Sequence, residues 1–265
     1  MSKEKYLILV SEGVTDCSLL EVLLEKFLDF LPYHNLKDLP EIFRQMVGKY
    51  PNVNGGLNRQ DSPTFYHNDQ VSVAVKQANG YSNIPKKIAG LIEVLEKEDL
   101  YAGFGGFLIF CDTDLKSKEE MIEIFRKAFL ENDVLYENDA LNVNDHTISC
   151  KLHLFPEHGN GAVEKLLLDC ASITYPFLCE DALAYRREIM QDQYSDLRKK
   201  HWAKDIDIQE FYADKVQFGA VSSVLKPDRP VRFTIKDEIF HRKYEQQYQK
   251  VTEFQLLMQF LKENL

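Results

Sequence analysis

The sequence predicts an α/β fold in which helices flank a mainly parallel sheet, with a helical extension at the C-terminus. Three observations lead to this prediction. Short apolar runs alternate with stretches of helical spacing four times in the first two thirds of the 265 residues, and repeated strand–helix units form parallel sheets. Several of the runs end in acidic residues, at the sheet edge where such folds bind ligands. The last third of the chain is charged and helical in pattern.

The first strand–helix unit lies at the N-terminus. Residues 6–10 are an apolar run, and Glu12 follows the predicted strand. Apolar side chains recur at helical spacing over residues 19–28, and Thr15 or Asp16 can cap that helix. We therefore expect Glu12 at the carboxyl end of the first strand.

A long segment of weak pattern, residues 31–70, is predicted to be an insertion. Residues 41–47 favour a short helix, and residues 52–63 form an Asn- and Gly-rich loop that is either a lid or a plain surface loop. Residues 71–75 then favour a strand and residues 85–98 a helix.

The apolar run 107–111 is predicted to be a strand buried on both faces, and it ends in Asp112 and Asp114. These two carboxylates point to the same side if the strand continues through them. Like charges that close together repel unless they share a proton or a cation, and Mg²⁺ prefers oxygen ligands.

A helix at 121–130 and a strand at 147–156 follow. The latter ends at Glu157, and Glu164 lies in the first turn of the next helix, where it also suits the helix dipole. We expect one α/β domain over residues 1–172 and a mainly helical part over 173–265 that packs on the same domain.

A basic helical segment is predicted at residues 183–204, with six basic residues against three acidic ones. Such a run is commonly a solvated helix face. The alternative is a nucleic-acid contact in which Trp202 stacks on a base, and its candidate residues are Arg186, Arg187, Lys199, Lys200 and Trp202.

Composition limits the function classes. The net charge of −10 excludes a nucleic-acid coat protein, so a polyanionic substrate needs a local basic patch or a bridging metal. The five cysteines have no C-x-x-C spacing, and no apolar run is long enough to cross a bilayer. We expect a cytoplasmic protein without membrane contact, and the sequence leaves a homodimer open.

Glu12, Asp112 and Asp114 suit a divalent-metal site for phosphodiester chemistry. An Asp-x-Asp pair alone also occurs in sugar-nucleotide transferases and dehalogenase-type phosphatases. Placed with the first-strand glutamate on one edge of the sheet, it resembles the Toprim domain of topoisomerases, primases and OLD-family nucleases. A further likeness, to small uncharacterised bacterial Toprim-like proteins, lies in the Leu154-Phe155-Pro156 strand end and the Gly-x-x-Glu-x-x-Leu start at Gly161.

The resemblance, which covers roughly residues 5–225, implies Mg²⁺ or Mn²⁺ at Asp112 and Asp114, with Glu12 in acid/base chemistry or metal binding. By analogy with OLD nucleases, Glu157 and Glu164 are candidates for a second metal and Lys215 for the late catalytic lysine. It implies a nuclease acting on DNA or RNA, in phage defence, with an ATPase partner on a separate chain. The alternatives are an inactive Toprim-fold binding or regulatory protein and a dehalogenase-type phosphatase.

Overall fold

The computed structural model describes residues 5–47, 63–97, 101–202 and 206–265. The chain divides into two compact units. The sheet unit comprises Met1–Cys111, Glu119–His153 and Lys262–Leu265, and the helical unit comprises Asp112–Lys118 and Leu154–Leu261. The expected division at residue 172 differs from this one, because both β5 and β8 carry their last residues into the helical unit.

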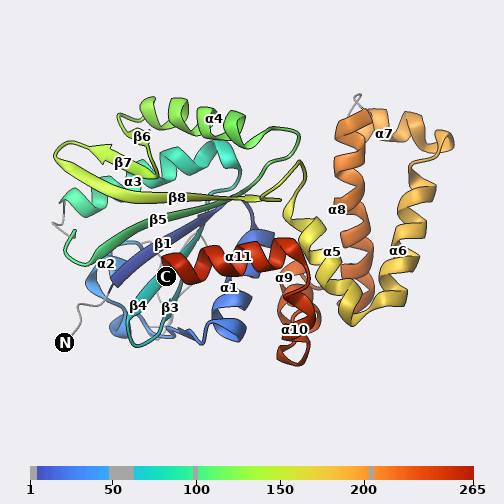
Figure 1. The fold of residues 1–265 in the computed structure, drawn as a ribbon, viewed down its shortest axis with the longest axis horizontal. Helices are drawn as coiled ribbons and strands as arrows, with labels where there is room; N and C mark the ends of the chain where they lie inside the picture. Colours follow the sequence, from blue (N-terminus) through green and yellow to red (C-terminus); the bar gives the residue numbers. More distant parts are fainter. Residues whose placement is uncertain (1–4, 48–62, 98–100, 203–205) are drawn as a thin grey trace. The chain divides into compact units, whose positions relative to one another are not determined.

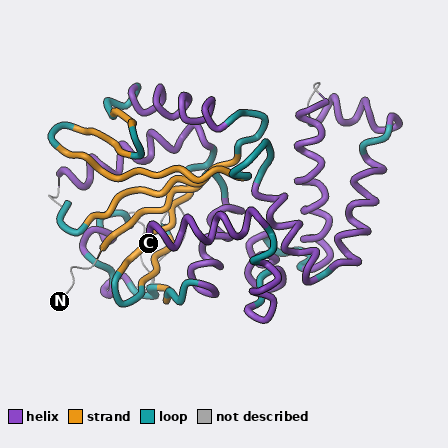
Figure 2. The backbone as a smooth tube through the Cα atoms, in the orientation of Figure 1, coloured by secondary structure: helices purple, strands orange, loops and turns teal. Residues whose placement is uncertain are grey.

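The strands form one mixed sheet, drawn in orange in Figure 2, with the order β2-β3-β4-β1-β5-β8-β7-β6. β1 pairs in parallel with β4 on one side and β5 on the other, whereas the β2–β3, β3–β4, β6–β7 and β7–β8 pairs are antiparallel. The strands are β1 Lys5–Ser11, β2 Leu31–Pro32, β3 Thr64–His67, β4 Val71–Gln77, β5 Phe104–Asp112, β6 Leu135–Glu137, β7 Ala140–Val143 and β8 His146–Phe155.

β5 and β8 advance in the same direction. Gly106 lies so close to Ser149 that an added Cβ would come within 2.2 Å of the Ser149 carbonyl oxygen. Further along, the Thr113 N–H donates to the Phe155 carbonyl over 2.9 Å. The centre of the sheet is therefore parallel, as expected, and antiparallel strands form both edges, which the sequence pattern did not predict.

The central strands are buried because helices cover both faces. In β1 the side chains from Leu7 to Val10 are at most 2% exposed, and in β5 those from Phe107 to Cys111 are equally buried. Because both faces of the sheet are covered, these strands are continuous apolar runs and do not alternate between apolar and polar residues.

The order of connections puts α1 and α3 on opposite faces. The chain goes from β1 through α1 to β2, returns through β3 to β4 on the same side of β1, and then goes through α3 past β1 to β5. Right-handed crossovers in opposite directions place the two helices on opposite sides, as Figure 1 shows. The order reverses between β1 and β5, which is where doubly wound sheets bind ligands. The helices of this region are α1 Val14–Phe27, α2 Glu41–Arg44, α3 Ile84–Lys97 and α4 Lys118–Leu130.

The helical unit is built on α5, α6 and α8, which pack on one another. Phe240, Tyr248 and Phe254 are fully buried, and their rings contact one another at centroid distances of 5.4–5.9 Å. Its helices are α5 Val163–Thr174, α6 Pro176–Ile189, α7 Ser195–His201, α8 Ile206–Leu225, α9 Val231–Thr234, α10 Glu245–Tyr248 and α11 Thr252–Asn264, with a π-helix at Ile235–Ile239; the last residues of α11, from Lys262 on, belong to the sheet unit.

Two predicted segments differ in the structure. The helix expected at 183–204 is broken, because Arg198 is buried and donates hydrogen bonds to the carbonyls of Ile189 and Gln191, which turns the chain between α6 and α7. The 31–70 insertion contains β2, α2 and β3, and most of the loop predicted at 52–63 lies outside the described residues. Within the described ranges, no helix has the length and apolar character needed to cross a membrane.

Candidate functional site

The carboxylate of Asp112 lies at the start of α5. Its Oδ1 accepts the backbone N–H of Val163 over 2.9 Å, and the side chain is buried. The first N–H groups of a helix have no partner inside the helix, and the helix dipole favours a negative charge at that end. The first turn of α5 therefore stabilises negative charge on the buried Asp112 carboxylate.

Lys215, which the sequence predicted as catalytic, is brought to the same carboxylate by α8. Its Nζ lies 3.8 Å from Asp112 Oδ2, and its side chain is about one third exposed. This distance suits an ion pair but is too long for a direct hydrogen bond. The ammonium group of Lys215 is therefore held near Asp112 by charge attraction.

Asp114 lies beyond the end of the strand. The expectation that Asp112 and Asp114 point to the same side assumed that the strand continues through both residues, and this assumption does not hold. β5 ends at Asp112, and Asp114 has a left-handed φ of 52°. The Thr113 hydroxyl accepts the Gly161 N–H over 3.1 Å, while the Asp114 N–H donates to the Gly161 carbonyl over 2.9 Å. These bonds join the turn after β5 to the loop before α5. The conformation of this turn therefore sets the direction of the Asp114 side chain.

Glu164 is a buried carboxylate beside these residues. Its Oε2 is buried and has no hydrogen-bond partner among the described residues. Burial raises the pKa of Glu164; Lys215 opposes the rise, and the charges of Asp214 and Asp114 add to it. The second position of α5 thus carries an acid whose charge is incompletely compensated.

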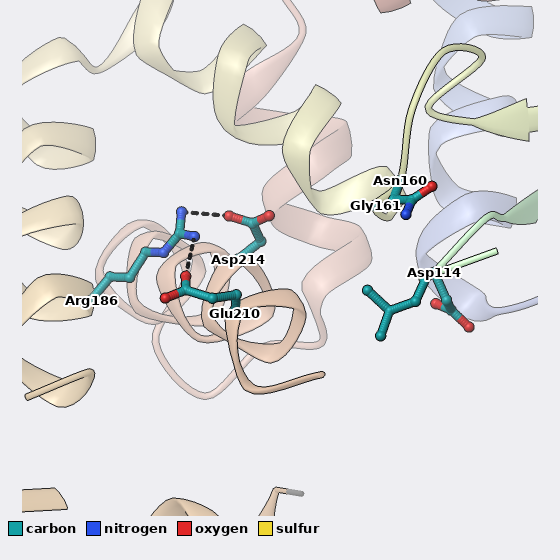
Figure 3. Close-up of a pocket in the computed structure, with 7 residues that line it drawn as sticks. Asp114, Asn160, Gly161, Arg186, Glu210 and Asp214 are labelled. Carbon is teal, nitrogen blue, oxygen red and sulfur yellow. Dashed lines mark hydrogen bonds and ion pairs between the residues drawn. The ribbon is translucent and has the colours of Figure 1, made fainter. Parts of the chain in front are cut away.

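Asp214 joins the group from α8 and was missed by the sequence analysis. Arg186 binds Asp214 Oδ1 through NH1 at 2.6 Å and approaches Glu210 Oε2 through NH2 at 3.5 Å, as Figure 3 shows. Burial raises the pKa of Asp214 even though Arg186 and Lys165 oppose the rise. The adjacent Lys215 was the one sequence signal that could have pointed to this aspartate.

The charges of this group do not balance. Burial also raises the pKa of Asp169, with Lys165 opposing and Asp214 adding to the rise. Together these residues contain six carboxylates and three cations, an excess of three negative charges, and we call them the acidic cluster: Asp112, Asp114, Glu164, Asp169, Glu210 and Asp214, with Lys165, Arg186 and Lys215.

The acidic cluster offers hard oxygen donors of the type that Mg²⁺ prefers, and the unpartnered Glu164 oxygen is one of them. In the described part of the chain, no three His, Cys, Asp or Glu side chains are arranged to hold an ion on their own. Mg²⁺ commonly uses one or two carboxylates together with waters and substrate phosphates. The residues therefore fit an ion that arrives with an anionic ligand, not a closed structural site.

Glu157, predicted as a metal ligand, lies elsewhere in the helical unit. Its carboxylate pairs with Lys118, and its backbone N–H donates to Glu253 Oε2 over 2.8 Å. These contacts hold the turn that follows β8. The structure thus places Glu157 in a structural ion pair, apart from the contacts that join the acidic cluster.

The predicted nucleic-acid residues fall into two groups. Arg186 is held by the carboxylates of the acidic cluster. The others lie further along: Arg187 is exposed on α6, Lys199 and Lys200 are exposed on α7, and the Trp202 ring lies 6.5 Å from that of Tyr212. The exposed Arg187, Lys199 and Lys200 are therefore the part of the predicted patch that can reach a phosphate backbone.

Glu12 belongs to the sheet unit. Its backbone N–H donates to the Phe110 carbonyl over 3.1 Å, just past the last β1–β5 pair, Ser11 with Phe110. Asp16 accepts the Gly13 N–H over 2.7 Å and so serves the start of α1, as expected of a helix-capping residue. Glu12 thus lies at the carboxyl end of β1, where the sequence predicted it.

A cavity of about 440 Å³ adjoins the acidic cluster in the helical unit. Figure 3 shows Arg186, Glu210 and Asp214 along one side of it and Asp114 and Asn160 along the other. Leu115 adds an apolar contact and Gly161 completes the lining.

Comparisons with known proteins show the fold and no more. No family model matches the sequence, and no curated protein matches it. A crystal structure of a hypothetical protein from Pyrococcus horikoshii OT3 is similar, with a TM-score of 0.51 and 16% sequence identity. The match covers 96% of this chain and 98% of that protein. The α/β architecture with a helical C-terminal region is therefore shared over nearly the whole length.

Proposed function

We propose that the chain carries out metal-dependent phosphodiester cleavage of nucleic acid, as a nuclease that resembles the Toprim and OLD types. The observation that supports the proposal most is the environment of Asp112. A buried carboxylate there lies between the first turn of α5 and Lys215, in a cluster with an excess of three negative charges. Such an excess is costly unless a cation or protons accompany the substrate. A cytoplasmic location is part of the proposal.

Each residue has a chemical role in this proposal. One or two of the carboxylates of Asp112, Asp114 and Glu164, together with waters and substrate phosphate oxygens, would hold Mg²⁺ or Mn²⁺, which would neutralise phosphate charge and favour ionisation of water. Lys215 donates an N–H to a non-bridging phosphate oxygen and stabilises the charge that develops there. Glu12 acts in acid/base chemistry, a role that comes from the sequence resemblance.

The test is cleavage of single- and double-stranded DNA and RNA by the purified full chain with Mg²⁺, Mn²⁺ or EDTA. We expect metal-dependent cleavage that Asp112→Asn and Glu12→Gln each abolish. Asp196→Asn is the matched control, because Asp196 is exposed on α7. Cleavage that persists in EDTA, or at wild-type rate in Asp112→Asn, contradicts the proposed site.

A second candidate is a binding or regulatory protein without catalysis. It is favoured by the two contacts of Asp112, because a carboxylate that supports α5 and pairs with Lys215 also has a structural role. The OLD resemblance implies a separate ATPase as the partner, with a role in phage defence. Nucleic-acid binding without turnover, together with recovery of an ATPase by the tagged chain, would establish this candidate over the nuclease.

A further inference from the structure

The cavity beside Asp114 has walls that suit a neutral, hydroxyl-bearing ligand better than a phosphate. Three of its lining residues are carboxylates, and its one cation, Arg186, is already paired with two of them. A phosphate would meet a net negative wall, and repulsion at close range is strong where solvent is limited. The phosphate of a substrate is therefore directed toward Lys215 and the metal ligands, and the cavity receives another part of the molecule.

Arg186 positions two of the three carboxylates of the cavity, Asp214 and Glu210. Arg186 NH1 binds Asp214 and also donates to Gln217 Oε1 over 3.4 Å, while NH2 approaches Glu210. A carboxylate accepts several hydrogen bonds, so each acid keeps acceptor capacity after pairing with the arginine. Fixed acceptors select ligands with hydroxyl or N–H donors at matching positions.

The remaining lining refines this selection. The Asn160 amide both donates and accepts, and Leu115 offers an apolar surface to the carbon face of a ring. Adjacent hydroxyls of a sugar also donate and accept, and a carboxylate is the usual partner of a ribose 2′-hydroxyl in nucleotide sites. The net negative lining also attracts cations, so a polyamine such as spermidine is the competing class of ligand that the experiment must exclude. The volume of about 440 Å³ lies in the usual range of ~300–1,000 Å³ for small-ligand sites.

We propose that this cavity binds the ribose of the nucleotide next to the scissile phosphate, which makes RNA the substrate class. The 2′-hydroxyl is the group by which a protein distinguishes RNA from DNA at a given site. The inference rests on the proposed nuclease function, since it assigns the sugar of the same substrate. Glu210, Asp214 and Asn160 are then the residues that determine the specificity.

Binding is tested by calorimetry on the full chain with adenosine 5′-monophosphate and 2′-deoxyadenosine 5′-monophosphate in Mg²⁺. Neither probe has a phosphodiester bond to cleave. We expect the ribonucleotide to bind roughly tenfold more tightly, which is the effect of one hydrogen bond to a charged group. Glu210→Gln and Asn160→Ala should reduce that ratio without altering affinity for the deoxynucleotide. Glu180→Gln, an exposed glutamate on α6, should leave the ratio unchanged.

The outcomes separate this inference from the function on which it rests. Equal affinity for the two probes, no binding of either, or spermidine binding that Glu210→Gln removes would overturn the ribose assignment. Equal cleavage of RNA and DNA oligonucleotides would also overturn it and leave the nuclease proposal intact. A chain that prefers the ribonucleotide yet cleaves neither polymer keeps the cavity assignment and loses the nuclease.

Discussion

The ammonium group of Lys215 lies 3.8 Å from Oδ2 of Asp112, while Oδ1 of the same aspartate accepts the Val163 N–H. Two helices therefore meet one carboxylate from different directions: α5 presents its first turn and α8 a side chain. The proposed catalytic contribution of this aspartate can be separated from its structural one, because each of its oxygens has a different partner.

Replacing Lys215 tests the electrostatic part of the proposal. We expect Lys215→Met to lower kcat by about 10²-fold or more, the usual effect of losing a donor at developing negative charge. The free energy of unfolding should change by less than ~1 kcal/mol, because the ammonium is partly exposed. Lys215→Arg should restore part of kcat. A Lys215→Met variant with unchanged kcat would remove Lys215 from the reaction.

Two substitutions of Asp112 separate folding from function. Asn keeps an oxygen that accepts the Val163 N–H, whereas Ala removes it, so only Asp112→Ala should lose about 1 kcal/mol of stability, as a lost helix cap does. Both should lose metal-dependent cleavage. Urea unfolding and the cleavage assay on the same preparations provide the measurement. Equal loss of stability in the two variants would show that the hydrogen bond from the Val163 N–H contributes little to the free energy of unfolding.

Glu164 gives the protein a predictable pH dependence. Burial raises the pKa of Glu164 in the folded chain above its ordinary value, so its ionised form destabilises the fold, and this cost disappears as the pH falls through the raised pKa. Glu164→Gln removes the ionisation. We expect its Tm to exceed that of the wild type by about 2–4 °C at neutral pH, with the difference shrinking toward about pH 5.

Thermal unfolding of both proteins between about pH 8 and pH 5 measures this effect. The wild type and Glu180→Gln should give the same curve, since Glu180 is exposed. A Glu164→Gln variant that is less stable than the wild type at every pH would mean that the carboxylate makes stabilising contacts which outweigh its burial.

The lysines of α7 should affect nucleic-acid affinity and not the chemical step. Lys199 and Lys200 are both exposed, and contacts to phosphates weaken binding as salt rises. We expect the double Ala variant to bind RNA more weakly. The slope of log affinity against log salt concentration should also decrease in magnitude by about one to two, which corresponds to the loss of two phosphate contacts. The double Ala variant of the exposed Lys236 and Lys250 makes the same charge change, and an equal effect there would indicate a general charge effect.

The long elements could be predicted because burial on both faces produces a strong sequence pattern. β1 and β5 are continuous apolar runs, and they were expected within a few residues of their observed bounds. The edge strands β2 and β6, and β7 beside β6, have only two to four residues and partly exposed side chains. Strands this short carry too little periodicity to be recognised, so the antiparallel edges were missed.

The acidic cluster was only partly predictable for a different reason. Asp112 and Glu164 follow recognisable elements, and Lys215 was proposed by resemblance. Asp214 enters the cluster only because α5, α6 and α8 pack together, which no local pattern indicates. The turn at Asp114 depends on hydrogen bonds between Thr113 and Gly161 across a long sequence separation, so extrapolating the strand through Asp114 was wrong.

Each compact unit is assembled from separated stretches of chain. The sheet unit includes the C-terminal residues Lys262–Leu265. Within this unit the Lys5 ammonium donates to the Asn264 carbonyl over 2.8 Å. A ribosome therefore releases the first strand long before its contact with Asn264 can form, and the sheet unit lacks its last segment until Lys262–Leu265 have been synthesised. Interleaved segments raise the mean sequence separation of contacts, which slows folding. Expression of either half alone should consequently yield aggregates that co-expression of the other half does not dissolve.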